Sequence, residues 1–352
     1  MNVAVVYNRE KRGIINVLGM QNREWYPEET ILNVVRALEK RGHTVEMIVA
    51  DRNLLARLKK FLPKLSKRRA PGIVFNLALG VQGKCRYTHV PALLEVAGIP
   101  YTGSSPLGHT LALDKVVAKQ ILMASGLPTP NYRIFTDPDQ TAPELQFPII
   151  VKPRGEAAGL GLKVVTDEGS LKEAVTYILE EYKQSALVEE FIEGREVNVS
   201  ILGNEDPQPL PVLEVEFEAG EDRIYTYEHK FSRKRKITKV CPASLPPETG
   251  AYIQKVAVQA YEALNIYDYG RVDIRLDKYN QPYILEMNSM ASVNPSSSFV
   301  RAAKAAGFTY DKLINKILDV TIKRYALEEP EFFGPENEEA QREFESLNKK
   351  VS

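Results

Sequence analysis

The chain has 352 residues, 44% of them hydrophobic and 26% charged, a composition typical of a globular protein with two or three packed domains. Its 46 basic and 46 acidic residues give a formal net charge of zero, so no general attraction to nucleic acid or to an anionic membrane is expected. No apolar run is long enough to cross a bilayer, and the two cysteines form no CxxC pair, so disulfides and structural zinc are not expected and a reducing cytoplasm is the predicted location.

The first hundred residues alternate between strand patterns and helix patterns. Helices are predicted over 28–40, 54–65 and 91–97, and strands over 2–7, 44–49, 72–79 and 99–105. This order predicts an α/β unit with a parallel sheet and right-handed crossovers. The first strand continues into YNREKRG rather than GxGxxG, so a dinucleotide site is not expected there.

The remainder of the chain mixes helices with strands joined by turns, as in an α+β arrangement. Asp114 is a predicted N-cap, and Ser170 with Glu173 forms an S-x-x-E capping box that predicts a helix running to about residue 182. A basic loop is predicted over 225–242 and an acidic tail over 327–352. The other predicted helices cover 115–125, 247–264, 298–306 and 310–325, and the predicted strands cover 147–153, 162–166, 186–192, 195–202 and 210–218.

The stretch 271–288, RVDIRLDKYNQPYILEMN, carries the clearest signal of a site. Its two halves alternate with a period of two around the turn-rich residues 278–281, which predicts a β-hairpin. A four-residue loop places Glu286 opposite Asp273 and puts Ile284 on the same face as Glu286. Two carboxylates that face each other across strands repel, so the pattern indicates a cation between them.

The donors at this hairpin are the carboxylates of Asp273 and Glu286 and the amide of Asn288. Oxygen donors without a nearby cysteine or histidine suit Mg²⁺, with Mn²⁺ as an alternative, far better than Zn²⁺. Mg²⁺ held by few carboxylates takes its other ligands from water and nucleotide phosphates. An ordinary amphipathic hairpin with a solvated charged face is the competing interpretation.

Signals of phosphate binding precede the hairpin. Lys152 ends an apolar strand just before a turn that contains Gly159 and Gly161. Such a turn lets backbone N–H groups approach phosphate oxygens, although glycine turns also join strands without any ligand. Lys115 and Lys230 are further candidate phosphate cations.

Other polar residues allow two interpretations each. Glu189 and Glu196 can accept hydrogen bonds from an adenine amino group or a ribose hydroxyl, or can be plain surface charge. The basic run 232–236 is interpreted as a solvated loop, with a nucleic-acid patch as the alternative. The histidines have no evident partner and are interpreted as surface or packing residues: His43, His89, His109 and His229.

The order and density of these parts resemble the ATP-grasp superfamily, and specifically D-alanyl-D-alanine ligase and its relatives. The resemblance spans roughly residues 72–325. Its motifs, as they stand in this chain, are YTGSS at 101–105 with LDK at 113–115 and Lys119, VKPRGEAAGLG at 151–161, VEEFIEGRE at 188–196, YTYEHK at 225–230, and RVDIRLD with LEMN within 271–288.

The resemblance implies an ATP-grasp fold with an N-terminal Rossmann-like (pre-ATP-grasp) domain, combining α/β and α+β parts, with ATP held between two α+β lobes. The implied division is an N-terminal substrate domain over 1–105, a central lobe over 106–187, a C-terminal lobe with the metal site over 188–326 and an acidic tail over 327–352.

The resemblance also implies roles for single residues. The ATP phosphates would be held by Lys115, Lys152 and Lys230, the adenine by Glu189 and the ribose by Glu196, with Leu285 beside the nucleotide. Two Mg²⁺ ions would be bound by Asp273, Glu286 and Asn288. Arg271 would steady the oxyanion of a tetrahedral intermediate, and Ser297 would meet the carboxylate of the incoming amino acid.

The implied reaction joins two small amino-acid substrates. A carboxylate attacks the γ-phosphate of ATP, and an amine displaces the resulting acyl phosphate to form an amide, with Lys230 and Arg271 among the residues that stabilise charge. The loop that carries residues 232–236 would close over ATP and exclude water. Neither nucleic acid nor a membrane is an expected partner, and a homodimer is left open.

The chain departs from the family pattern at the amino-acid subsites. Ala158 and Gly159 stand where the family has serines, Phe231 stands where it has tyrosine, and NLALGVQGK at 76–84 replaces the histidine-bearing HGxxGEDG stretch. Candidates for the glutamate that holds the ammonium group of the first substrate are Glu10, Glu28 and Glu29.

These departures leave the substrate open. D-alanine is the default expectation from the resemblance. A second hypothesis keeps the chemistry but places another carboxylate or amino acid in the site, as in natural-product or peptide biosynthesis. A third is a regulatory protein that binds ATP without catalysis, although such a protein would not need the whole set of Arg271, Asp273, Glu286 and Asn288.

Overall fold

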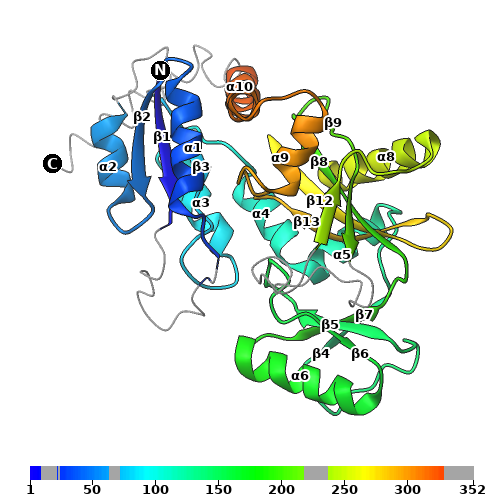
Figure 1. Cartoon of the computed structure of the whole chain (residues 1–352). Coiled ribbons are helices and arrows are strands. Elements are labelled where there is room, and N and C mark those ends of the chain that lie inside the picture. Colours follow the sequence, from blue (N-terminus) through cyan, green and yellow to red (C-terminus); the bar gives the residue numbers. More distant parts are fainter. Residues whose placement is uncertain (9–21, 23, 63–71, 218–236, 329–352) are drawn as a thin grey trace, which may run out of the picture.

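Figure 1 shows a computed structural model of the chain, which describes residues 1–8, 22, 24–62, 72–217 and 237–328. Within these ranges the strands form a three-stranded sheet near the N-terminus, a four-stranded sheet in the middle and a six-stranded sheet toward the C-terminus. Several residues singled out in the sequence lie outside the described ranges: Glu10, the segment 225–236 with His229, Lys230, Phe231 and the basic run, and the acidic tail from residue 329 onward.

The N-terminal sheet has the order β2-β1-β3 with parallel pairing, as predicted. Val3 and Val5 pack in the core that includes α1, and Ala4 and Val6 pack in the core that includes α2. β1 is apolar throughout because both of its faces are covered. The bounds are β1 Asn2–Tyr7, β2 Thr44–Val49, β3 Ile73–Leu77, α1 Glu28–Glu39, α2 Leu54–Phe61 and α3 His89–Val96.

The chain after this sheet differs from the sequence prediction. The strand predicted over 99–105 is wrong, since Tyr101 makes only an isolated bridge to Val74. A helix that the pattern did not predict follows, α4 Pro106–Leu113, with the Ser105 side chain accepting a hydrogen bond from the Gly108 amide. A proline in the first helical turn and a serine before it are a usual helix start, but the apolar residues of α4 show little helical periodicity.

The middle sheet is antiparallel, with the order β4-β7-β5-β6, and α6 covers one of its faces. The predicted capping box of Ser170 and Glu173 is wrong by one turn. Asp167 caps the helix instead, accepting from the Ser170 amide at 2.8 Å, while Ser170 Oγ accepts from the Asp167 amide at 3.2 Å. The bounds are β4 Tyr132–Phe135, β5 Ile149–Pro153, β6 Lys163–Val165, β7 Ala186–Glu190 and α6 Glu168–Tyr182.

The six-stranded sheet runs β11-β10-β8-β12-β13, with β9 beside β8. β11 lies within the loop predicted over 225–242, so that prediction is wrong for residues 237–240, which pair with β10. The polar side chains of this edge strand hide its alternation in the sequence. The bounds are β8 Arg195–Leu202, β9 Gln208–Pro209, β10 Leu213–Phe217, β11 Ile237–Val240, β12 Tyr269–Leu276 and β13 Pro282–Asn288.

The remaining helices complete two different cores. α4, α5 Lys115–Ala124 and α8 Pro247–Ala263 pack with buried residues of β8, β12 and β13. α9 Ser298–Ala305 and α10 Tyr310–Glu328 instead contribute to the core that contains α1 and one face of the N-terminal sheet. Figure 1 accordingly shows α10 close to the N-terminal sheet although it ends the described chain.

The four-stranded sheet and α6 form a lobe that lies apart from the other two sheets in Figure 1. Side chains from β5 and β7 in this lobe meet side chains from β12 and β13 around a common pocket. The fold therefore brings together polar residues from four strands of two sheets. Among the described residues, no helix has both the length and the apolar character needed to span a bilayer.

Candidate active site

The hairpin β12–β13 is confirmed, and it places Asp273 opposite Glu286 as predicted. The route to this pairing differs from the prediction. The loop has five residues, 277–281, and a bulge then leaves Leu285 as the extra residue of β13. The two differences cancel, so the predicted pairing survives.

The bulge corrects the predicted position of Ile284. This residue pairs with Ile274, is fully buried in the core with α8, and does not share a face with Glu286. Burying an isoleucine side chain contributes on the order of 2 kcal/mol, which favours a bulge over a register that leaves it at the polar face. The extra residue, Leu285, then reaches the pocket together with Glu286.

Asp273 is held by two neighbours on the same hairpin. Arg271 Nε and Nη2 donate to its two carboxylate oxygens at 2.6 and 2.7 Å. Asn288 Nδ2 donates to Asp273 Oδ2 at 3.0 Å. Arg271, Asp273 and Asn288 thus form one hydrogen-bonded group, in which the Arg271 guanidinium offsets the charge of the Asp273 carboxylate.

Lys115 approaches the second carboxylate of the hairpin. Its ammonium lies 3.6 Å from Glu286 Oε2 and also donates to the carbonyl oxygen of Glu156 in the glycine-rich loop. Burial lowers the pKa of Lys115, and the Glu286 carboxylate partly opposes this shift. Lys115 is the first residue of α5, where the Asp114 side chain accepts from the amides of Val116 and Val117 as the predicted N-cap.

Glu189 lies between two lysines in the interior of the pocket. Its carboxylate pairs with Lys119 at 2.9 Å and with Lys152, and its side chain is only 2% exposed. Burial raises the pKa of Glu189, but the two ammonium groups outweigh burial and hold the pKa below its ordinary value. Burial also lowers the pKa of Lys119 to about 8, against the opposing effect of Glu189.

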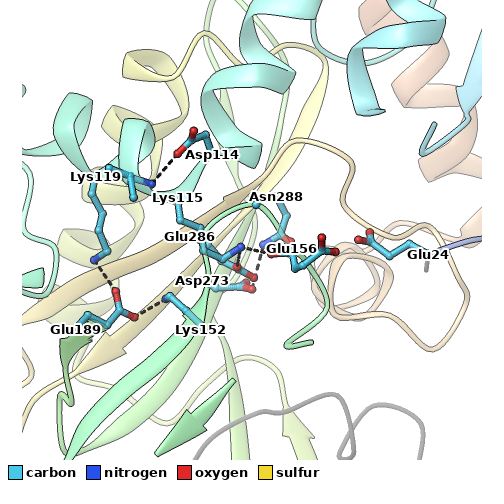
Figure 2. A network of polar contacts seen from close by, with 12 residues as sticks. Glu24, Asp114, Lys115, Lys119, Lys152, Glu156, Glu189, Asp273, Glu286 and Asn288 are labelled. Carbon is cyan, nitrogen blue, oxygen red and sulfur yellow. Dashed lines mark hydrogen bonds and ion pairs between the residues drawn. The ribbon is translucent and has the colours of Figure 1, made fainter. Parts of the chain in front are cut away.

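Lys119 was not assigned a role from the sequence, although a signal existed. It follows Lys115 by four residues, so the two lysines lie on one face of α5, and each pairs with a carboxylate that lines the pocket. Figure 2 shows both lysines extending from α5 toward carboxylates of the sheets, Lys119 toward Glu189 and Lys115 toward Glu286.

Glu196 lies on β8 directly across from Arg275 on β12, and the two side chains pair at 3.4 Å. The Arg275 guanidinium also lies 5.0 Å from the centre of the Phe191 ring. Glu196 and Arg275 line the same pocket as Glu189. The predicted ribose-binding residue thus belongs to the site, with its charge balanced by an arginine.

One pocket collects most of the predicted ligand-binding residues. It is lined by Lys115, Lys152, Glu189, Glu196, Asp273, Leu285 and Glu286, together with the apolar side chains of Ile150, Leu160, Leu162, Phe191 and Ile192. A smaller adjoining pocket shares Lys115 and Glu286 and includes Asn288. Apolar walls with a few convergent charged groups are typical of small-molecule sites.

Some predicted residues lie elsewhere. Ser297 caps α9, its Oγ accepting from the Val300 amide at 3.3 Å, and it lines neither pocket. Glu28 and Glu29 are exposed in the first turn of α1, where Glu29 pairs with Arg36 at 3.0 Å. Among the described N-terminal residues, Glu24 lies beside the site, as Figure 2 shows, although no motif in the sequence marks it.

His109 is a packing residue, as the sequence interpretation allowed, and the structure also gives it a polar partner. Its Nδ1 lies 2.8 Å from Ser289 Oγ, and its ring meets the Tyr87 ring edge to face at 6.3 Å. The residue is completely buried, and burial lowers its pKa to about 3. His109 is therefore a neutral packing residue behind the adjoining pocket.

Two sheets contribute lysines, glutamates and a facing carboxylate pair to one pocket, an arrangement suited to a small ligand that carries several charges. Residues 121–319 match the family described as D-ala D-ala ligase C-terminus. The D-alanine–D-alanine ligase of Carboxydothermus hydrogenoformans is 35% identical over 81% of this chain and 90% of its own length. The uncharacterized protein y4sG of Sinorhizobium fredii is 43% identical over 92% and 98%.

Solved structures share the fold. The D-alanine–D-alanine ligase from Bacillus anthracis complexed with ATP superposes with a TM-score of 0.73 at 22% identity, covering 93% of this chain and 99% of that one. The VanG D-Ala:D-Ser ligase of Enterococcus faecalis superposes with a TM-score of 0.69 at 20% identity, covering 91% and 99%. The chain belongs to the D-alanine–D-alanine ligase family of ATP-grasp carbon–nitrogen ligases.

Proposed function

We propose that this protein uses ATP to join the carboxylate of one amino acid to the amine of a second through an acyl phosphate. The observation that carries the proposal is the pocket in which Asp273 and Glu286 face each other below Lys115. Such a site can neutralise a triphosphate and hold it in line with an attacking carboxylate. D-alanine is the first substrate to test, since several relatives are named for it.

The donors at the hairpin fit Mg²⁺. Two facing carboxylates and the Asn288 amide are hard oxygen ligands, and Mg²⁺ commonly takes one or two protein carboxylates and completes its shell with water and phosphate. Bound Mg²⁺, proposed as two ions with Mn²⁺ as a substitute, would supply positive charge for phosphoryl transfer.

The protein's own residues divide the remaining work. Lys115 and Lys152 bind phosphate oxygens, and the buried position of both ammonium groups strengthens this attraction. Because Lys152 is paired with Glu189, the acidic partner also orients it. Glu189 and Glu196 accept hydrogen bonds from the adenine and the ribose, and Leu285 packs beside the base.

Arg271 and Ser297 act on the amino acids in this proposal. The guanidinium of Arg271 stabilises the oxyanion that forms when the amine attacks the acyl phosphate. Ser297, at the N-terminus of α9, binds the carboxylate of the attacking amino acid, an anion that a helix N-terminus favours. Lys230 is proposed as a third phosphate ligand on sequence grounds alone.

The proposal also includes the domain division, the location and the assembly of the protein. The domain division at residues 105, 187 and 326 follows from the family pattern, and a cytoplasmic location suits a reaction that consumes ATP. The substrates are small molecules, with a homodimer as the assembly to test. A second candidate keeps the chemistry with a different first amino acid, favoured by Ala158 and Gly159, which lack the hydroxyl groups of the family serines.

The test is phosphate release from ATP, with and without Mg²⁺, against D- and L-amino acids singly and in pairs, with mass detection of the product. Release with D-alanine alone and formation of its dipeptide supports the leading proposal. Release with another carboxylate or pair retains the mechanism and changes the substrate. Absence of an amide product with every pair, despite ATP binding, contradicts the proposed ligation of two amino acids.

A further inference from the structure

Arg86 is a buried charge that the proposed chemistry does not use. It lies in the short 3-10 helix Arg86–Thr88, and its side chain is only 3% exposed. Burying a guanidinium costs several kcal/mol unless charged and hydrogen-bonding partners compensate. The partners that offset this cost therefore indicate what the guanidinium of Arg86 holds in place.

The guanidinium joins two parts of the chain that are far apart in sequence. Nη2 lies 3.0 Å from Glu24 Oε1 and 3.4 Å from Glu156 Oε2, and Nη1 donates to the Gly155 carbonyl oxygen at 3.0 Å. Glu24 belongs to the N-terminal part, whereas Gly155 and Glu156 begin the glycine-rich loop after β5. Figure 2 shows the two glutamates extending toward each other beside the hairpin carboxylates.

Glu156, on the glycine-rich loop, also contacts Lys115, which lines the pocket. The Glu156 carbonyl oxygen accepts from Lys115, and its carboxylate accepts from Gln184 Nε2 at 2.7 Å. Gln184 Oε1 in turn accepts from the Gly155 amide at 2.8 Å. A few residues further on, the same loop supplies Gly159 and Leu160 to the wall of the pocket.

The Glu24 end is anchored as well. One oxygen faces Arg86 and the other accepts from the Tyr87 hydroxyl. The Glu24 amide donates to Asn22 Oδ1 at 3.0 Å, and Asn22 Nδ2 donates to the Leu79 carbonyl oxygen at 2.8 Å. A continuous chain of polar contacts thus runs from the end of the N-terminal sheet to the loop that borders the pocket.

We propose that Arg86 is a positioning residue that fastens the glycine-rich loop to the N-terminal part of the protein through Glu156 and Glu24. It does so in a chain that has Ala158, Gly159 and Phe231 in place of hydroxyl-bearing side chains. Fastening this loop keeps the pocket closed and keeps water from an acyl phosphate. The catalytic consequence rests on the proposed function, but the fastening itself does not.

The first experiment measures amide hydrogen exchange over residues 154–162 in the unmodified protein and in Arg86→Lys and Glu156→Gln. Lysine at position 86 keeps the charge but lacks the planar guanidinium that reaches three acceptors, and glutamine at position 156 removes the charge that pairs with Arg86. Faster exchange in this loop is therefore expected for both variants. The control is Arg57→Lys, which changes an exposed pair with Asp51 and leaves the loop unchanged. Unchanged loop exchange in both folded variants overturns the proposal, whether or not any substrate is known.

The second readout is the ratio of phosphate released to amide formed, measured with the substrates found above. Arg86→Lys is expected to lower kcat by about tenfold to a hundredfold, the effect of a small misplacement, and to raise this ratio as water competes with the amine. A purely structural role would lower both products together with the melting temperature and leave the ratio constant, which contradicts the positioning role.

Discussion

At the scale of single residues, the proposed chemistry depends most on Glu286, which faces Asp273 across the hairpin and lies 3.6 Å from Lys115. Glu286→Gln keeps the size of the side chain and removes its charge, so the fold is expected to persist. Turnover is expected to fall by about a hundredfold or more, since charge stabilisation in such sites is worth about 3 kcal/mol. The measurement is Mg²⁺-dependent phosphate release.

The matched control for this change is Glu248→Gln, which alters an exposed glutamate in the first turn of α8. It should leave turnover unchanged. Normal turnover of Glu286→Gln, with a metal requirement like that of the unmodified protein, would remove Glu286 from the proposed metal ligands.

His109 makes a prediction about acid stability. Its pKa is lowered to about 3 by burial, whereas an exposed histidine titrates near 6.5. Between pH 3 and pH 6.5 this histidine is therefore protonated in the unfolded chain but neutral in the folded protein. The free energy of unfolding that depends on His109 is thus full above about pH 6.5 and decreases toward pH 3, by up to about 1.4 kcal/mol per pH unit.

The check is urea unfolding of the unmodified protein and of His109→Gln at pH 7 and pH 5. The variant is expected to be less stable at pH 7, because the Ser289 contact and the ring packing change, but to lose less stability on acidification. An equal loss in both proteins would exclude His109 as a source of the pH dependence.

At the scale of elements, the start of α5 joins local structure to the site. Asp114 accepts hydrogen bonds from two amides of the first turn and pairs with Arg154, and Lys115 follows it directly. Asp114→Ala is expected to destabilise the protein by about 1 kcal/mol and to raise the KM for ATP, since loss of the cap releases the turn that positions Lys115.

Asp114→Asn separates these effects, because asparagine is also a good N-cap but carries no charge for Arg154. Thermal unfolding and the KM for ATP should lie close to the values of the unmodified protein. If Asp114→Asn is as impaired as Asp114→Ala, the pair with Arg154 rather than the cap positions Lys115.

The hairpin shows how far element-scale reasoning from sequence reaches. Alternation predicted two strands and the facing pair correctly, but the loop length and the face of Ile284 were wrong. Counting residues around a turn cannot detect a bulge. Its position is decided by the core around α8, which gains more from burying Ile284 than the ladder loses at Leu285.

At the scale of the whole molecule, the pocket is lined by residues of both the four-stranded and the six-stranded sheet. A ligand that binds only the folded form stabilises it, by about 2.7 kcal/mol at a concentration a hundredfold above Kd. A nonhydrolysable ATP analogue with Mg²⁺ is therefore expected to raise Tm by several degrees.

The corresponding GTP analogue should raise Tm less if Glu189 and Glu196 recognise adenosine. Lys152→Ala should reduce the rise with the ATP analogue, since it removes a phosphate ligand and leaves Glu189 with one lysine partner. Equal shifts for both nucleotides would contradict adenine recognition.

The sequence by itself determined most of the helices and strands and the identity of the main charged residues. The alternation of strand and helix segments predicted the parallel N-terminal sheet, and the motifs with Lys115, Lys152, Glu189, Asp273 and Glu286 predicted a site that the fold assembles in one pocket. These features depend on local patterns, because side-chain periodicity and cap chemistry are properties of neighbouring residues.

Only the tertiary structure decided which charges meet. Lys119 pairs with Glu189, Arg86 contacts both Glu24 and Glu156, and His109 contacts Ser289. The two residues of each contact are 62 to 180 positions apart along the chain. Such pairs leave no periodic trace in the sequence. They form because a buried charge or polar group must find a partner, and packing of distant elements determines which partner is within reach.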